Sequence, residues 1–449
     1  MKNAALVLCL VLVTVQGAAA PDTRILPMRE RAAVVDRWLD ERHADRVAGP
    51  DASRRHRSLG DRLAGIQQGP GPRALACPRH GSRRAGEQIL LIHDPGDGAP
   101  LETLAVARYG VGDTFVEAWD KEQHGDQWQR LAELIVERDP RRIGLNYSET
   151  FALADGISHT EHRLFREALP ENLHERIVSA EQLAIGWLET RSAAEMEIYP
   201  QIVRIAHEIL AGGLSDAVIQ PGVTTTDDVA WWYRDRVREL KLASWFHPSV
   251  SVQRAEQAAL DAKASIAARH DDEVIRPGDL LHVDFGITYL RLNTDTQQHA
   301  YVLRPGETAA PPALREAFAR GNRLQDILTG HFETGISGND ILARALAQAE
   351  REGITASIYT HPIGYHGHAA GPTIGLWDQQ GGVPGRGDYP LNPDTAHSIE
   401  LYAETEIGSW GKAVRIKLEE DAFFDGETTW YIDGRQRELF LIPRSPAVQ

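Results

Sequence analysis

The segment from Leu280 to Leu303 constrains this chain more than any other stretch, because it has the pattern of two apolar strands that each carry an aspartate. Asp284 lies within Leu-His-Val-Asp-Phe, and Asp295 follows eleven residues later. Burying a carboxylate costs several kcal/mol unless it is paired or binds a metal, and a second carboxylate nearby adds repulsion. Either these side chains face solvent, with Asp295 as a simple turn residue, or the hairpin contributes to a cation site.

Further possible metal ligands follow along the chain. Residues 360–373 contain three histidines, His361, His366 and His368, among glycines and prolines, a composition typical of a loop. Glu400 and Glu419 then lie in apolar, strand-like segments. Carboxylates with one imidazole suit a pair of divalent cations such as Mn²⁺ better than a structural zinc site, which favours thiolates and more histidines. These residues favour the cation site.

The motifs resemble those of the pita-bread metallopeptidases, which include Xaa-Pro aminopeptidase, prolidase, methionine aminopeptidase and creatinase. The resemblance spans about residues 190–425 and rests on Gly278-Asp-Leu-Leu-His-Val-Asp-Phe-Gly286, the second aspartate, Gly367-His-Ala-Ala-Gly371 and the two glutamates. Residues 188–195 and 220–223 are also similar to the family. The resemblance implies an α+β chain with a C-terminal pita-bread domain, residues 186–449, after an α/β creatinase-type N-terminal domain, residues 21–185.

Carried over to this sequence, the resemblance assigns five ligands to two divalent metal ions: Asp284, Asp295, His368, Glu400 and Glu419. In this assignment Asp295 and Glu419 bridge the two ions, and Glu420 is the alternative to Glu419. Glu419 is preferred because an apolar run follows it, as in the closing strand of the family. We expect Mn²⁺ first, with Zn²⁺ or Co²⁺ as alternatives.

Three further histidines are the expected catalytic groups: His361, His366 and His270, in that order. A hydroxide bridging the ions would attack a peptide carbonyl, and a histidine would help to stabilise the oxyanion. The alternative for each is an ordinary loop or surface histidine. The histidine loop departs from the family, because Gly375 stands where a histidine usually follows the metal-binding one by seven residues.

The remaining sequence predicts local structure. Residues 1–20 combine Lys2, a short apolar run and small residues before Pro21, which indicates a secretory signal peptide, with an uncleaved anchor as the alternative. Residues 49–87 are expected to be irregular. Trp231 and Trp232 are expected in the core. Apolar periodicity and caps predict helices over 28–47, 128–138, 193–210, 226–242, 311–329 and 338–352, and short strands at 89–93, 104–109, 143–147, 280–303 and beyond 397.

The sequence therefore predicts a secreted or periplasmic dinuclear metallo-exopeptidase, similar to Xaa-Pro aminopeptidases and dipeptidases, that acts on short peptides. One alternative is a pita-bread protein whose altered histidine loop has made it a peptide- or partner-binding module. The other is a hydrolase of non-peptide C–N bonds. The formal charge of −16 without a basic stripe argues against nucleic acid. No membrane association is expected after signal cleavage, and the family suggests a homodimer.

Overall fold

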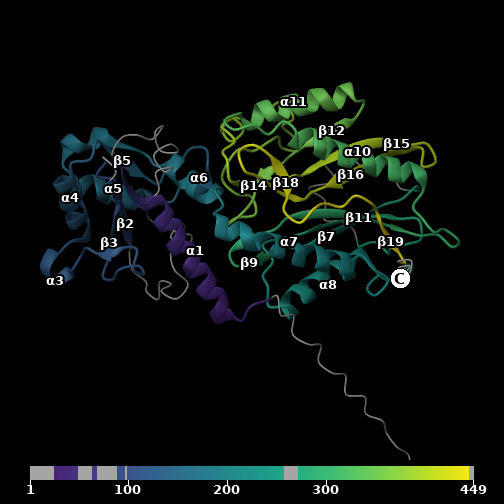
Figure 1. Cartoon of the computed structure of the whole chain (residues 1–449), viewed down its shortest axis with the longest axis horizontal. Coiled ribbons are helices and arrows are strands. Elements are labelled where there is room, and N and C mark those ends of the chain that lie inside the picture. The colour runs from purple at the N-terminus through teal and green to yellow at the C-terminus, as the bar shows by residue number, and fades with distance from the viewer. Residues whose placement is uncertain (1–24, 49–62, 68–87, 97–98, 257–271, 444–449) are drawn as a thin grey trace, which may run out of the picture.

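The computed structural model describes residues 25–48, 63–67, 88–96, 99–256 and 272–443. The predicted signal peptide and His270 therefore lie outside the described residues. Figure 1 shows two lobes, with the N-terminal lobe in purple and blue and the larger C-terminal lobe in teal to yellow. Within the described part, the helices lack the combination of length and apolar character that a membrane span requires.

The N-terminal lobe is built on one mixed sheet with strand order β4-β3-β2-β1-β5-β6. Its core joins Ile89, Leu91 and Ile143 of the strands to Leu131 and Ile135, which lie on the apolar face of α4. The strands are β1 (Leu63–Gln67), β2 (Ile89–His93), β3 (Glu102–Val106), β4 (Val116–Glu117), β5 (Arg142–Leu145) and β6 (Ile177–Ser179). The helices are α3 (Lys121–His124), α4 (Gln127–Arg138) and α5 (His159–Ala168), with short 3₁₀ turns η3 (Ala152–Ala154) and η4 (Glu171–Arg176).

Strand β1 corrects the expectation that residues 49–87 are irregular. It pairs antiparallel with β2 and parallel with β5 inside the sheet. Its sequence, Leu-Ala-Gly-Ile-Gln, has only two large apolar residues. Such a short run lacks the alternation that distinguishes a strand from a loop, so only the pairing with its neighbours defines it.

Helix α1 (Met28–Ala48) contacts both lobes of the molecule (Figure 1). Near its start, the Leu26 amide donates a hydrogen bond to the Tyr289 hydroxyl at 2.8 Å. Near its end, the Arg42 guanidinium donates to the carbonyl oxygen of Thr190 at 2.8 Å. The predicted domain boundary at residue 185 falls within α6 (Glu181–Glu189). Helix α1 thus joins the connection between the lobes to the C-terminal lobe.

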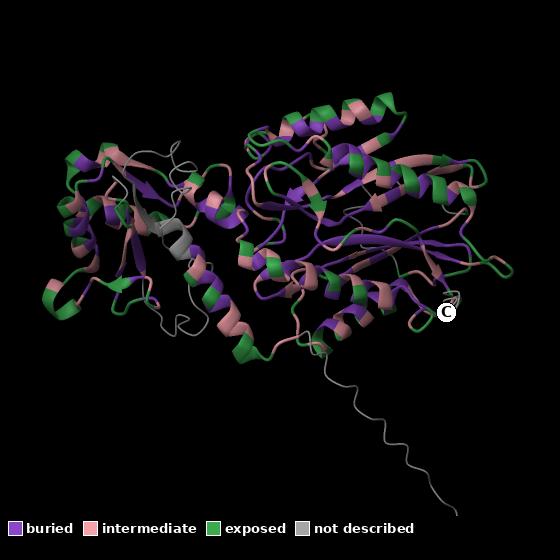
Figure 2. Cartoon of the chain, in the orientation of Figure 1, coloured by how far each residue is buried: buried purple, intermediate pink, exposed green. Residues whose placement is uncertain are grey.

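The C-terminal lobe places its three larger sheets between two pairs of helices, and β9 and β10 form a separate two-stranded sheet. Helices α7 and α8 pack on the sheet β19-β11-β8-β7, and α10 and α11 pack on β12-β15-β16, while β13-β14-β17-β18 completes the interior. Figure 2 shows the strands of this layer as largely buried. The helices are α7 (Ala193–Gly213), α8 (Thr226–Glu239), α10 (Pro312–Thr329) and α11 (Gly338–Arg351). The strands are β7 (Ser249–Gln253), β8 (Leu280–Phe285), β9 (Thr288–Tyr289), β10 (Leu292–Asn293), β11 (Thr296–Val302), β12 (Thr355–Ile358), β13 (His361–Pro362), β14 (Thr395–Ser398), β15 (Leu401–Ile407), β16 (Lys412–Leu418), β17 (Asp421–Phe424), β18 (Thr429–Tyr431) and β19 (Phe440–Ile442).

The helices of this lobe begin where the sequence predicts. Ser192 and Glu195 form a capping box at the start of α7, and Thr225 and Asp228 form another at α8. Pro200 lies inside α7, which continues to Gly213, so the proline does not mark the start of the helix. Local capping chemistry therefore sets these boundaries, as expected from sequence.

Candidate metal centre and active-site pocket

Four acidic residues and two histidines converge in the interior of the C-terminal lobe. Three overlapping groups each have ligand atoms within 4.8 Å of one another: Asp284, Asp295 and Glu419; His361, Glu400 and Glu419; and Asp295, His361 and His368. All five residues predicted as metal ligands belong to this cluster, and His361 joins them. The arrangement excludes the alternative in which the two hairpin aspartates simply face solvent.

The acidic residues occupy places where strands meet or end. Asp284 lies within β8, Asp295 immediately precedes β11, and β8 and β11 pair antiparallel. Glu400 lies between β14 and β15, immediately before Leu401, and Glu419 follows the last residue of β16. An isolated bridge between Gln297 and Glu419 brings the two parts of the chain together. The sheet edges therefore bring the acidic groups together, although the two aspartates lie more than a hundred positions before the two glutamates in sequence.

Buried acidic oxygens at this point lack partners. Asp284 Oδ1 and Asp295 Oδ1 are buried without a hydrogen-bond partner. Among the described residues, no lysine or arginine forms an ion pair with any of the four acidic groups. Burial raises the pKa of Asp284, Asp295 and Glu400, and the charge of nearby Glu419 raises each of these pKa values further. Divalent cations would supply the missing positive charge, so the residues fit a metal centre.

His361 is better placed than His368 to be the nitrogen ligand. Its Nε2 lies 3.3 Å from Glu419 Oε1 and 3.6 Å from Asp295 Oδ2. Burial lowers its pKa, but the hydrogen bond and charge of Glu419 outweigh burial and raise the pKa to about 9 when the acidic charges are not neutralised. A bound cation would displace this proton, because metals bind neutral imidazole. His361 lies on the short strand β13, which pairs with β14, whereas His368 is exposed on the following loop.

Neighbouring side chains orient Glu419, and Glu419 and Glu420 have different hydrogen-bond partners. The Ser398 hydroxyl donates to Glu419 Oε1 at 2.8 Å, and the Gln297 amide donates to Glu419 Oε2 at 2.7 Å and also to Glu400. Glu420 points instead toward His207, whose Nε2 lies 2.7 Å from Glu420 Oε2. Glu420 Oε1 also accepts hydrogen bonds from Gln298 and Gln436. The geometry therefore favours Glu419 as the ligand, since Glu420 already has its partners.

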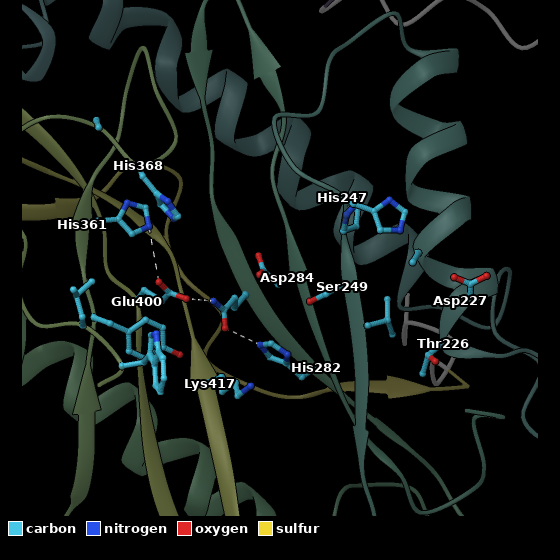
Figure 3. A pocket seen from close by; sticks show the side chains of 18 of the residues that line it. Thr226, Asp227, His247, Ser249, His282, Asp284, His361, His368, Glu400 and Lys417 are labelled. Atoms are coloured by element: carbon cyan, nitrogen blue, oxygen red, sulfur yellow. Dashed lines mark hydrogen bonds and ion pairs between the residues drawn. The ribbon is translucent and has the colours of Figure 1, made fainter. Parts of the chain in front are cut away.

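The cluster opens into a pocket of about 1070 Å³. Figure 3 shows His361, His368 and Glu400 on one side, His247, Thr226 and Asp227 on the other, and Asp284 and Ser249 between them. His366 is not among the residues that line the pocket. Its pKa is lowered by burial and by Arg291 and Arg191, which places this ring near arginines that do not line the pocket. The structure thus brings His361 and His368, but not His366, to the candidate centre.

Three lining residues were missed by the reasoning from sequence: His282, Gln297 and Lys417. His282 Nε2 lies 2.8 Å from Gln297 Oε1, so one side chain holds the other against the acidic cluster. Burial lowers the pKa of Lys417, whose side chain lines the pocket. The strand period could have identified His282, because residues two apart in a strand, such as His282 and Asp284, lie on the same face.

His299, for which the sequence offered no role, is a buried connector. Its Nδ1 lies 2.9 Å from the Leu281 carbonyl oxygen, and the Lys417 amide donates to its Nε2 at 3.1 Å. Burial lowers its pKa to about 4, so the ring is neutral at pH 7. It therefore links β8 to β16 and fixes the backbone of Lys417 beside the pocket.

The histidine loop is held from two sides. Asn293 donates two hydrogen bonds, both of 2.8 Å, to the Gly364 carbonyl oxygen, and the Tyr365 hydroxyl donates to Glu195. A Cβ atom at Gly367 would lie 2.4 Å from the indole of Trp245, so only glycine allows this close approach. These contacts fix the loop between His361 and His368 against the hairpin and α7.

Comparisons with known proteins agree with this geometry. Residues 201–420 match the model of metallopeptidase family M24. A search of curated protein sequences found no match. Similar solved structures include an X-Pro aminopeptidase from Thermotoga maritima, with a TM-score of 0.59, 17% identity and coverage of 86% of this chain and 99% of that chain. A Xaa-Pro dipeptidase from Bacillus anthracis has a TM-score of 0.55, 15% identity and coverage of 92% and 99%. A putative aminopeptidase P from the same organism has a TM-score of 0.58, 12% identity and coverage of 90% and 96%.

These findings confirm the α+β fold and the family resemblance that the motifs suggested. The chain covers nearly the whole length of these solved structures. The acidic cluster lies within the matched segment, at the point where the sheets meet. Through residues 201–420 the chain thus matches metallopeptidase family M24, and it has the pita-bread fold.

Proposed function

We propose that this protein is a secreted metallo-exopeptidase that holds two divalent ions, Mn²⁺ first among them, and hydrolyses the N-terminal bond of short peptides. The observation that carries the proposal is the cluster of buried and half-buried acidic groups, whose charges no arginine or lysine pairs within the described residues. Proline at the second position of the substrate is supported by the names of the similar structures, an X-Pro aminopeptidase and a Xaa-Pro dipeptidase. Secretion rests on the predicted signal peptide.

In this proposal the ligands are Asp284, Asp295, His361, Glu400 and Glu419. When bound, the two ions would activate a water molecule and polarise the peptide carbonyl. Ser398 and Gln297 hold Glu419 in its orientation before any ion binds, as outer hydrogen-bond partners do at other metal sites. With His361 as the ligand, His368 lies seven residues beyond it, which is the spacing that the family usually shows.

His368 is then the histidine that faces the substrate. Its ring centroid lies 4.5 Å from that of His361, and its side chain lines the pocket. In the metal-free protein the charge of His361 and burial lower its pKa to about 4, and the charge of a bound divalent cation would likewise favour the neutral imidazole. A neutral imidazole donates a hydrogen bond to a developing oxyanion through one nitrogen and accepts a proton through the other. This role replaces the earlier assignment of His368 as a metal ligand.

Metal content followed by peptide hydrolysis tests the proposal. The mature chain is equilibrated with Mn²⁺, desalted and analysed for metal, then incubated with Xaa-Pro dipeptides, Xaa-Pro tripeptides and proline-free peptides. We expect about two ions per chain, as in other two-metal hydrolases, and release of the N-terminal residue. Retained ions without cleavage of any peptide would favour the binding-module alternative. Retention of no ion would contradict the proposal.

The assignment of His361 has its own test. His361→Ala is expected to lower Mn²⁺ affinity by more than the roughly 10- to 100-fold typical of outer partners. His368→Ala is expected to leave Mn²⁺ affinity within a few-fold and to lower kcat by about 10²-fold, the usual contribution of one such histidine. The opposite pattern, with metal lost only in His368→Ala, would restore the assignment made from sequence.

A further inference from the structure

We propose that Trp231 and Trp377 are specificity-determining residues that bind bulky apolar side chains of the peptide on opposite walls of the pocket. The inference rests on the proposed function and adds a substrate class to it. Trp231 is 54% exposed and Trp377 is 39% exposed, yet both line the pocket that contains the acidic cluster. Large exposed aromatic side chains that face one cavity mark a surface for a ligand.

Trp231 lies on the wall formed by α8. Thr226, Asp227, Ala230 and Trp231 all line the pocket, so the first two turns of this helix present one continuous face to it. The Trp231 ring meets that of His247 in an edge-to-face contact, with 5.3 Å between their centroids. Because Figure 3 places His247 across the pocket from His361 and His368, Trp231 belongs to that opposite wall.

The adjacent tryptophan shows that the exposure of Trp231 is specific to its position. Both tryptophans were expected in the core, but only Trp232 packs against it. Trp232 is close enough to α7 that a Cβ atom at Gly212 would lie 3.2 Å from its ring. The core therefore accounts for Trp232, whereas the Trp231 side chain remains 54% exposed.

Trp377 lies on the wall of the histidine loop. The Ile374 amide donates to the Thr360 carbonyl oxygen at 2.9 Å, so the segment leading to Trp377 runs beside His361. Leu376 also lines the pocket and extends this apolar surface. Trp231 and Trp377 thus lie on the two walls that flank the candidate metal centre.

The size of the pocket supports contacts on both walls. Its volume of about 1070 Å³ exceeds the usual range of about 300–1,000 Å³ for sites that bury a drug-sized ligand. A peptide bond held at the acidic cluster has one residue on each side of it. The side chains of these two residues are therefore expected to reach the two indoles, which favours peptides with a large apolar residue over peptides with alanine.

The test compares Trp231→Ala and Trp377→Ala with Trp430→Ala. Trp430 is a matched control, because it is 39% exposed and does not line the pocket. Each metal-loaded variant hydrolyses two pairs of peptides, one that differs only at the first residue (Phe-Pro against Ala-Pro) and one that differs only at the second (Ala-Phe against Ala-Ala), so that each indole is tested by the pair that varies its own residue. We expect each pocket variant to raise KM for the phenylalanine peptide by roughly tenfold, with little change for its alanine partner. Trp231→Phe should restore most of the preference.

Several outcomes would overturn the inference. One is an equal change for both peptides of a pair, and another is an effect of the same size in Trp430→Ala. Loss of a dimer in either pocket variant, measured by light scattering, would assign the tryptophan to a subunit interface instead. If the wild-type protein cleaves no peptide, the proposed function fails, and quenching of tryptophan fluorescence by the same peptide pairs still tests the subsites. An equal affinity for both peptides would then contradict the inference.

Discussion

Two groups of buried acidic side chains in this protein have opposite electrostatic environments. The first is the candidate metal centre, where burial and Glu419 raise the pKa of Asp284, Asp295 and Glu400. The second is Glu195 at the start of α7. Burial alone would raise its pKa, but the charges of Arg191 and Arg42 outweigh burial, and the pKa is lowered.

The difference shows which buried acids need a metal. Glu195 Oε2 accepts a hydrogen bond from Arg42 at 2.9 Å, and Glu195 Oε1 accepts one from the Tyr365 hydroxyl. Glu420 is satisfied in the same way by His207 at 2.7 Å. Within the described part of the chain, the four acidic residues of the metal centre have His361, amide and hydroxyl donors and the nearby charge of Lys417, but no ion pair with a lysine or an arginine. Burial is therefore common to both groups, and the nearby cationic partner decides between a structural ion pair and a metal ligand.

The largest effect is expected from Asp295→Asn, which removes a central ligand. Activity should fall by at least about 100-fold, because the loss of a ligand exceeds the loss of an outer partner. In the metal-free protein the same substitution should raise Tm, since it removes a charge that is repelled by Glu419 and Asp284. Activity against Mn²⁺ concentration and Tm with and without metal measure both effects. A lower Tm in the metal-free variant would contradict the comparison.

Glu195→Gln should instead lower the stability of the protein, whether or not metal is bound. It leaves Arg42 and Arg191 buried without their acidic partner, and breaking such a pair costs about 3–5 kcal/mol. The decrease in the free energy of unfolding, measured with urea, should be equal with and without Mn²⁺. A destabilisation that appears only in the metal-loaded protein would mean that Glu195 belongs functionally to the metal centre.

The pH dependence of stability should also separate the two groups. In the metal-free protein, acids with raised pKa hold protons more tightly in the folded state than in the unfolded chain. Stability should therefore fall by roughly 1–3 kcal/mol as the pH rises from about 5 to 8. Glu195, with its lowered pKa, contributes stability above its ordinary value of 4.5 and loses it as the pH falls below that value.

Saturation with Mn²⁺ should reduce or reverse the loss of stability toward pH 8, because deprotonated ligands bind the metal more strongly. Chemical unfolding at both pH values measures the change, and a metal-free stability that does not depend on pH in this range would contradict it.

Tyr365→Phe tests the link between Glu195 and the histidine loop, and among the substitutions it is expected to have the smallest effect. Loss of the hydrogen bond to a charged acceptor should cost about 1.5–3 kcal/mol of stability. Because Tyr365 lies between His361 and His368, kcat should also fall. The control is Tyr147→Phe in the N-terminal lobe, a residue whose hydroxyl forms no hydrogen bond among the described residues. Equal decreases in stability and kcat in the two variants would contradict a role for Tyr365 in holding the histidine loop.

Sequence reasoning succeeded where local patterns carry the information. The capping boxes at Ser192 and Thr225 predicted the starts of α7 and α8, and the apolar period of α4 predicted its length. The motif resemblance predicted the fold that the comparisons confirm. Sequence reasoning failed at β1, which is a strand only through pairing with β2 and β5, and at Trp231, which is exposed although it shares its helix with the half-buried Trp232.

The sequence by itself therefore determined the fold family and the set of acidic residues, since capping, periodicity and motif spacing are encoded along the chain. Only the tertiary structure decided the roles within that set. It placed His361 rather than His368 nearest to Asp295 and Glu419, and it gave Glu420 a partner in His207. The physical reason is that electrostatic energy depends on distance and burial in space. Two adjacent glutamates are equivalent in sequence until the fold pairs one with a cation and leaves the other in the acidic cluster.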